Sequence, residues 1–270
     1  MINVTVTGAC GRMGSAIIRH LLNQPDMKLA GAVENPQHKN INKDIGEILG
    51  IGKSGIEISS SLEKVVDRSD VIIEFVNPKT SIDHLGIARS FKKPIVIGTT
   101  GFNEPEYEII NNISKDIPCV LSPNMSIGVN ALFYLGPKLA KMLGDDYNVE
   151  IIEAHHNLKK DAPSGTALKL AELLADGLNR DLKECGVHGR SGITGARNKN
   201  EIGIHAVRGG DIVGDHTIVF AGPGERIEVT HRAHSREVFV FGAIKAARFI
   251  VNARPGLYNM QDVLGEGSVK

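Results

Sequence analysis

The first 34 residues constrain the fold most strongly, because a strand pattern, a glycine turn, a helix pattern and a second strand follow one another without a break. Residues 2–7 form a short β-branched run, and a glycine-rich turn over residues 8–14 comes directly after it. Apolar residues at helical spacing follow, and residues 28–33 predict a second strand that ends at Glu34. This order is typical of the βαβ unit that binds a dinucleotide.

The glycine turn reads Gly8-Ala9-Cys10-Gly11-Arg12-Met13-Gly14, so its glycines are spaced three apart and Ala9 replaces one glycine of the commonest motif. An ordinary strand-to-helix turn is the alternative interpretation, but the strands on both sides favour a nucleotide site. Glycines there allow a tight turn and let backbone N–H groups approach a pyrophosphate. We therefore expect residues 8–13 to contact the cofactor.

The residues that end the second predicted strand bear on the choice of nucleotide. Glu34 lies 20 residues after Gly14, where an acid accepts hydrogen bonds from the adenosine ribose. Asn35 follows it, whereas sites for NADP usually carry an arginine or lysine near this point. Lys39 or another cation of this loop could reach back. The sequence favours NADH and leaves NADPH open as an alternative.

Two later loops are candidates for the rest of the nucleotide site. One predicted strand leads into Gly98-Thr99-Thr100, and another leads into Ser122-Pro123-Asn124-Met125. Ligands bind at the carboxyl ends of strands in open α/β sheets, so the first loop is expected to meet the ribose or nicotinamide. In the second loop, Asn124 or Ser126 caps the next helix or lies against the nicotinamide, and both roles stay open.

The strand and helix pattern changes after about residue 126, which indicates a second domain. Strands are expected at 147–154, 202–209, 213–220 and 225–233, with turn residues between the last three. The predicted fold class is α/β, a Rossmann-like dinucleotide-binding domain plus an α+β substrate domain with a mostly antiparallel sheet. We place the first domain at residues 1–126 and 236–270 and the second, for substrate binding and oligomerisation, at 127–235.

Titratable residues are concentrated in the stretch 153–167, where a predicted strand ends and a helix begins. His155 and His156 are adjacent, and Lys159 follows four residues after the first of them. Histidine exchanges protons near neutral pH, and lysine supplies a charge and a donor. Adjacent histidines on a strand point in different directions and no further Cys/His pair has ligand spacing, so we expect no metal.

The helix that follows this stretch is expected to start at Ser164. Its hydroxyl is predicted to cap the helix, which leaves the N–H groups of Gly165 and Thr166 to bind an anion. Together with the histidines and the lysine, this predicts a catalytic site that also holds a carboxylate.

Charge and cysteine content exclude several other classes. Formal net charge is zero, which argues against a general nucleic-acid or membrane-adsorbing surface. No apolar run approaches the roughly 18 residues of a membrane span. The three cysteines form no CxxC pair, and no signal-type segment opens the sequence, so a cytoplasmic location is expected.

Several motifs resemble the bacterial 4-hydroxy-tetrahydrodipicolinate reductase (dihydrodipicolinate reductase) family, an enzyme family of the diaminopimelate/lysine pathway. The most specific is Glu153-Ala-His-His-Asn-Leu-Lys-Lys-Asp-Ala-Pro-Ser-Gly-Thr166. The glycine turn, Gly98–Phe102, Ser126–Asn130, Arg208–His216 and Asp262–Leu264 match as well. The sequence departs from the family at Asn35, where some members have arginine, at Met125, where phenylalanine is frequent, and at Val76-Asn77.

The resemblance implies a function and a set of residue roles. The enzyme would use NADH or NADPH to reduce 4-hydroxy-tetrahydrodipicolinate, a small cyclic imine with two carboxylates, with loss of water. His155 would be the acid/base group and Lys159 a proton donor, while His156, Gly165 and Thr166, with Ser164 at the helix start, would bind carboxylates. The resemblance also implies a homotetramer assembled through the second-domain sheet. The implied nucleotide contacts are Gly8, Ala9, Cys10, Gly11, Arg12, Met13, Glu34, Gly98, Thr99, Thr100, Ser122, Pro123, Asn124 and Met125.

Two other interpretations remain. A dehydrogenase that works through a cysteine thiohemiacetal needs an activated cysteine, and Cys119 lies inside a predicted strand. A nucleotide-sensing protein without turnover would not need His155 or Lys159, and a DNA-binding sensor would need a basic recognition helix, which the sequence lacks.

Overall fold

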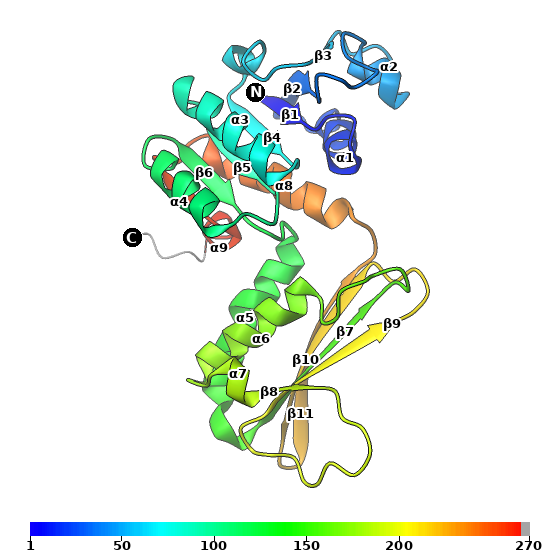
Figure 1. The fold of residues 1–270 in the computed structure, drawn as a ribbon, viewed down its shortest axis with the longest axis vertical. Helices are drawn as coiled ribbons and strands as arrows, with labels where there is room; N and C mark the ends of the chain where they lie inside the picture. Colours follow the sequence, from blue (N-terminus) through cyan, green and yellow to red (C-terminus); the bar gives the residue numbers. More distant parts are fainter. Residues whose placement is uncertain (266–270) are drawn as a thin grey trace. The chain divides into compact units, whose positions relative to one another are not determined.

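The computed structural model describes residues 1–265, and their backbone divides into two compact units (Figure 1). Unit 1 comprises Met1–Ile127 and Glu237–Lys270, of which residues 266–270 lie outside the described part of the chain. Unit 2 comprises Gly128–Arg236. The roles that we expect of the two parts, nucleotide binding for the first and substrate binding with oligomerisation for the second, stay predictions.

Unit 1 is built on a parallel sheet with the strand order of a dinucleotide-binding fold. Within residues 1–265 this sheet has seven strands, and each pairs in parallel with its neighbours. The Rossmann-like fold class is therefore confirmed. In spatial order the strands are β12 (Gly256–Tyr258), β6 (Pro118–Leu121), β5 (Ile95–Ile97), β4 (Val71–Glu74), β1 (Ile2–Thr7), β2 (Met27–Val33) and β3 (Ile58–Ser59).

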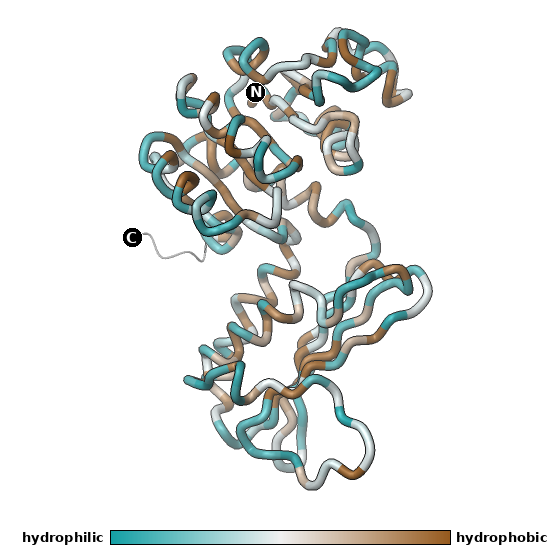
Figure 2. The backbone as a smooth tube through the Cα atoms, in the orientation of Figure 1, coloured by the Kyte–Doolittle hydropathy of each residue, from teal (hydrophilic) through white to brown (hydrophobic). Residues whose placement is uncertain are grey.

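Both faces of this sheet are covered by helices, because alternate residues of its strands are apolar on both sides. Val71, Ile73 and Val96 belong to a core with helices α1 (Arg12–Leu21) and α8 (Glu237–Ile250). Ile72 and Ile95 belong to a second core with α3 (Pro78–Ser90) and α4 (Glu104–Ile113). Figure 2 shows the hydrophobic colour along these central strands. The shorter helices α2 (Ile45–Leu49) and α9 (Met260–Val263) complete the α-helices of the described part of unit 1.

The sheet of unit 2 is mixed, so the expectation of a mostly antiparallel sheet is wrong. Its order is β11 (Glu225–Ala233), β10 (Gly214–Gly222), β7 (Asn148–His155), β9 (Ile202–Arg208) and β8 (Gly186–His188). The pairs β11–β10 and β10–β7 are antiparallel, while β7–β9 and β9–β8 are parallel. The turn residues Gly209-Gly210 suggested a hairpin. Instead, the chain leaves β9 and passes β7 to reach β10. Of the two glycine turns, only the one at Gly222–Gly224 forms a hairpin, between β10 and β11.

One face of the mixed sheet packs against helices and the other stays open. Inward residues such as Ile151, Ile218 and Phe220 form a core with α5 (Ile127–Leu143) and α6 (Gly165–Gly177), beside the short α7 (Leu182–Cys185). Ile152 and Val207 are 41% and 47% exposed. A half-buried sheet of this kind has apolar surface left to cover.

Candidate active site

The glycines of the turn in unit 1 let two backbone segments come closer together than any residue with a Cβ would allow. Gly8 has φ +64°, in the left-handed region that favours glycine, and its carbonyl accepts a hydrogen bond from Gly11 N at 2.9 Å. A Cβ on Gly14 would lie 2.1 Å from the Gly8 oxygen. The first turn of α1 carries no acidic residue. The turn and the helix start therefore suit the phosphate groups of a nucleotide.

The acid after β2 lies beside this turn. Glu34 Oε2 accepts from Cys10 N at 2.9 Å, and Oε1 accepts from Asn35 N at 2.9 Å. The carboxylate is only partly buried. Each oxygen keeps further acceptor capacity, which is what recognition of ribose hydroxyls requires. Together with burial, the Glu34 charge raises the pKa of the Cys10 thiol, so that sulfur is no nucleophile.

The other loops predicted to hold the nucleotide follow β5 and β6. Thr99 is 4% exposed, and its hydroxyl accepts from Val76 N at 3.1 Å and from Ser81 Oγ at 2.9 Å. Met125 is 1% exposed and belongs to the core that contains α8. Thr100 is exposed. Contacts from Thr99 and Met125 to a ligand would therefore go through the backbone, while Thr100 can use its side chain.

In unit 2, a buried carboxylate holds the histidine predicted to be catalytic. Glu153 and His155 both lie on β7, two residues apart, so their side chains share one face of the strand. Glu153 Oε2 is 2.6 Å from His155 Nδ1, and the Glu153 side chain is fully buried. The His155 ring is 12% exposed and therefore stays accessible to a small molecule.

Three elements supply donors to the same carboxylate. Arg208, the last residue of β9, donates from Nη1 to Oε2 at 2.8 Å and from Nη2 to Oε1 at 2.7 Å. Ser164 N donates to Oε1 at 2.9 Å. Burial raises the pKa of Glu153, but the hydrogen bonds from Arg208, His155 and Ser164 outweigh it and hold the pKa below its usual range. The group is an anion at neutral pH.

Lys159 lies in the loop after β7 and pairs with an acid two residues later. Its Nζ is 2.9 Å from the carboxylate of Asp161, and the lysine side chain is 20% exposed. The hydrogen bond from Lys159 lowers the pKa of Asp161. Arg208 Nη2 also donates to the Asp161 carbonyl at 2.8 Å, which ties this loop to β9. Asp161 thus orients the lysine.

Ser164 caps α6, as expected from the sequence. Its hydroxyl accepts from Ala167 N at 3.1 Å, and Gly165 and Thr166 form the first positions of the helix. The same hydroxyl lies 3.2 Å from His216 Nε2. His156 follows the end of β7, and its Nδ1 is buried with no hydrogen-bond partner among residues 1–265. A polar nitrogen buried in this way is suited to an incoming acceptor.

A second imidazole lies against His155. His216 on β10 is 3% exposed, and its ring centroid is 5.2 Å from that of His155 in an edge-to-face arrangement. Burial, then the nearby His155, lowers the pKa of His216 to about 3. The imidazole of His216 is therefore neutral at physiological pH.

Sequence reasoning missed three residues of this cluster. Glu153, Arg208 and His216 stood within matching motifs, but they received no role. The spacing of Glu153 and His155 on one strand was the available signal, because i and i+2 share a face. No local signal identifies Arg208 or His216, since strand pairing alone brings them to β7.

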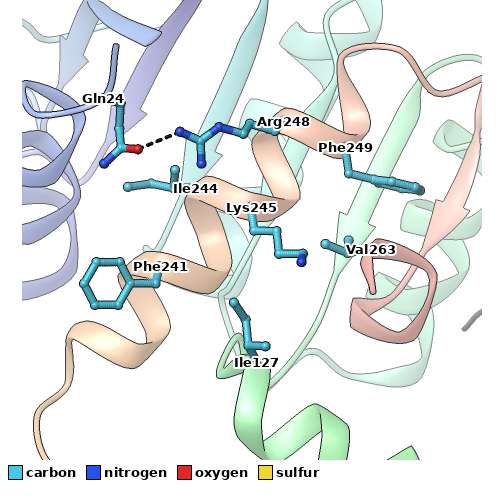
Figure 3. Close-up of a pocket in the computed structure, with 8 residues that line it drawn as sticks. All are labelled: Gln24, Ile127, Phe241, Ile244, Lys245, Arg248, Phe249 and Val263. Atoms are coloured by element: carbon cyan, nitrogen blue, oxygen red, sulfur yellow. Dashed lines mark hydrogen bonds between the residues drawn. The ribbon is translucent and has the colours of Figure 1, made fainter. Parts of the chain in front are cut away.

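Other features of the described residues do not compete with this cluster. A hollow of about 590 Å³ along α8 is lined mainly by apolar side chains, and Arg248 in it donates to Gln24 (Figure 3). Arg248 is already paired with Asp26 at 2.7 Å.

Burial raises the pKa of Cys119 to about 12, which removes the candidate for cysteine catalysis. Across residues 1–265, no acidic, histidine or cysteine cluster has the arrangement to hold a metal, and no helix is long and apolar enough to cross a membrane.

A parallel dinucleotide-binding sheet and an acid–base cluster in a second unit define the class of two-unit nicotinamide-dependent oxidoreductases. The family model described as "Dihydrodipicolinate reductase, N-terminus" matches residues 2–125, and the one described as "Dihydrodipicolinate reductase, C-terminus" matches residues 128–264. The chain belongs to the dihydrodipicolinate reductase family. The resemblance found from its motifs is thus confirmed.

Full-length relatives agree with this assignment. A 4-hydroxy-tetrahydrodipicolinate reductase of Syntrophus aciditrophicus is 52% identical over 265 residues, which cover 98% of this chain and 99% of the relative. One of Hahella chejuensis is 49% identical over the same coverage. The solved structure of a dipicolinate-bound dihydrodipicolinate reductase from Paenisporosarcina sp. TG-14 matches with a TM-score of 0.77 at 26% identity, covering 97% of this chain and 98% of that one.

Proposed function

We propose that this protein reduces 4-hydroxy-tetrahydrodipicolinate to tetrahydrodipicolinate with NADH or NADPH, with loss of water, in diaminopimelate and lysine biosynthesis. The observation that carries the proposal is the family match over both units, to residues 2–125 and 128–264. The Glu153–His155 pair at the end of β7 supports it chemically, because it is a proton-exchanging group held by a carboxylate.

The proposed roles follow from the chemistry of the reaction. When bound, the nicotinamide supplies the hydride. Negative charge then develops at the ring nitrogen of the substrate, and a proton is needed there. His155 supplies or relays this proton, and Lys159 stabilises the electron-rich state by its positive charge. The substrate carboxylates are held by His156, by the α6 start at Ser164 and Gly165, and by Thr166.

The residues of unit 1 fit a dinucleotide. The turn from Gly8 to Met13 packs so closely that a Cβ on Gly14 would lie 2.1 Å from the Gly8 oxygen, and Glu34 has acceptor capacity for a ribose. Glu34 followed by Asn35 favours NADH, because a carboxylate repels the 2′-phosphate of NADPH. The further proposed contacts, listed with the resemblance, are Gly98, Thr99, Thr100, Ser122, Pro123, Asn124 and Met125.

We also infer an assembly and a location. The open face of the mixed sheet exposes Ile152 and Val207 at 41% and 47%. Burying such a face on further copies of the chain supports a homotetramer through this sheet. A biosynthetic role with NAD(P)H supports a cytoplasmic location.

A coupled assay tests the activity. The substrate is generated freshly by its synthase, and nucleotide oxidation is followed at 340 nm with each nucleotide in turn. We expect turnover with both nucleotides and a KM for NADH no higher than that for NADPH. A marked preference for NADPH would contradict the role given to Glu34 and Asn35. No turnover with either nucleotide would overturn the function.

Two variants test the acid–base roles. His155→Gln and Lys159→Ala should each lower kcat about 10²-fold or more, the usual effect of removing an acid/base group. His205→Gln is the control, because His205 lies on β9 and bonds Glu150 at 2.7 Å instead of Glu153. Wild-type kcat in both site variants would exclude the proposed mechanism.

A further inference from the structure

We propose that Glu153, clamped by Arg208, is a positioning residue for His155: it fixes the imidazole with the proton on Nδ1 and leaves Nε2 as the nitrogen that exchanges protons with the substrate. This inference rests on the proposed role of His155. It assigns a task to two side chains that the reaction itself does not touch.

The Glu153 carboxylate is saturated with hydrogen bonds. Oε1 accepts from Arg208 Nη2 and Ser164 N, and Oε2 accepts from Arg208 Nη1 and His155 Nδ1. Each oxygen thus accepts two hydrogen bonds, which uses its acceptor capacity fully. An ionised carboxylate has no proton to give, so Nδ1 of His155 must be the donor. The neutral ring is therefore held in one tautomer.

The other ring nitrogen of His155, Nε2, lies beside Gly214 of β10. A Cβ on this glycine would lie only 3.1 Å from that nitrogen. The space beside Nε2 is kept open by this glycine. Nε2 has no hydrogen-bond partner within residues 1–265, and this atom is therefore the one available to a ligand.

The charges around the His155 ring also favour a proton on it. Charged or titratable groups reach this region from β7 (Glu153), β9 (Arg208), β10 (His216), β11 (His231) and the loop with Lys159 and Asp161. His216 packs edge-to-face on His155 and is neutral. Arg208 is neutralised by the same carboxylate that it orients. Glu153 is thus the anion that directly stabilises a proton on His155.

Removing the charge of Glu153 should mainly slow the chemical step. Glu153→Gln keeps the size of the side chain but offers a neutral amide to both His155 and Arg208. Loss of the outer partner of a metal-ligating histidine typically costs 10–100-fold, and we expect a loss in the same range for a histidine that exchanges protons. We expect kcat to fall about 50-fold within that range while KM for either substrate changes less than about threefold. The alkaline limb of the kcat–pH profile should move to lower pH, because the imidazolium loses its counter-charge.

Glu150→Gln is a matched control on the same strand. Glu150 also pairs with arginines, Arg190 at 2.9 Å and Arg197 at 2.8 Å, and with His205, but not with His155. Its variant should lower the melting temperature and leave the alkaline limb in place. If Glu153→Gln behaves like Glu150→Gln, with equal losses of thermal stability and an unmoved limb, Glu153 is only structural and the inference is wrong.

A second measurement needs no turnover. In the wild-type protein, ¹⁵N–¹H correlation spectra report the tautomer of each histidine, and His155→Gln identifies the signals of His155. In its neutral form, His155 should be the Nδ1–H tautomer. An Nε2–H tautomer would overturn the inference whatever the kinetics are. An Nδ1–H ring in a protein without reductase activity would instead overturn the proposed function and keep the positioning.

Discussion

The two units each contain a carboxylate at or near the end of a strand, and the two carboxylates differ in burial and in the number of hydrogen bonds that they accept. Glu34 follows β2, is partly exposed, and accepts two hydrogen bonds, both from backbone N–H groups. Glu153 lies on β7, is fully buried, and accepts four, two of them from one arginine. The Glu34 carboxylate keeps acceptor capacity for a ligand, whereas donors of the protein occupy the full acceptor capacity of Glu153.

The difference separates binding from positioning. A carboxylate that recognises a ligand must stay incompletely bonded and near solvent until the ligand arrives. A carboxylate that orients a catalytic group must be saturated, since spare capacity would allow alternative arrangements. The two sites should therefore respond differently when a partner is removed.

The largest effect is expected where the buried pair is broken. Arg208→Met leaves the buried Glu153 without its main counter-charge and should lower the free energy of unfolding by about 3–5 kcal/mol. Urea denaturation followed by circular dichroism measures it. Arg226→Met is the control, because its pair with Glu228 is exposed and should contribute less than about 1 kcal/mol. Equal effects of the two variants would show that Glu153 does not depend on Arg208.

The next largest effect is expected at the glycine turn of unit 1. Gly14→Ala would place a Cβ 2.1 Å from a backbone oxygen that cannot move without opening the turn. We expect a loss of about 3 kcal/mol in stability, at the upper end for overpacking, together with loss of nucleotide binding in a fluorescence titration. Gly86→Ala, in α3 with open space around its Cβ, should be neutral or stabilising. A fully active Gly14→Ala protein would argue against the tight turn.

A smaller effect depends on pH and tests the neutral imidazole beside His155. The folded chain protonates His216 only at about pH 3, whereas the unfolded chain does so near its ordinary pKa of 6.5. The unfolded state therefore binds more protons between these values, and stability falls as the pH decreases. Between pH 6.5 and about pH 4.5 this group should remove about 2 kcal/mol.

His216→Asn isolates that contribution, because the variant lacks the titrating ring. Wild type and variant are compared by urea denaturation across this pH window. The difference in stability between them should shrink as the pH falls. A constant difference would mean that folding does not lower the pKa of His216.

The smallest effect is expected at Glu34. Glu34→Gln keeps the size of the side chain but removes the charge that accepts from Cys10 N and, in our proposal, from the ribose. NADH should bind about tenfold more weakly, the value of one charged hydrogen bond, and NADPH should lose less because repulsion of its phosphate also disappears. Fluorescence titration with each nucleotide measures this, with the exposed Glu63→Gln as control. Equal losses for both nucleotides would contradict the preference assigned to Glu34.

The sequence predicted unit 1 well because its fold is encoded locally. Buried parallel strands are apolar runs, the turn at residues 8–14 requires glycine, and Glu34 follows directly from β2. The mixed sheet of unit 2 was predicted less well. Strand spacing identified β9, β10 and β11 but not their order, since a short glycine turn after β9 is compatible with either a hairpin or a crossing.

For the candidate site, too, local features could be predicted from the sequence and long-range contacts could not. Ser164 was predicted as a cap from its position before a helix, and the structure bears this out. The contacts of Glu153 with Arg208, 55 residues later, and of Ser164 with His216, 52 residues later, depend on strand pairing that no local pattern specifies. The residues proposed to touch a ligand were predicted from a recognisable motif, whereas the contacts that hold them were visible only in three dimensions.

The place of β7 inside its sheet has a consequence for how the protein loses function on heating. β7 is hydrogen-bonded on both sides, to β10 and to β9, and its amides cannot exchange by fraying of an edge. The backbone around Glu153 and His155 should therefore be among the slowest in the unit to exchange hydrogen for deuterium. Thermal inactivation and global melting of this unit should then coincide, without an earlier stage in which β7 opens alone.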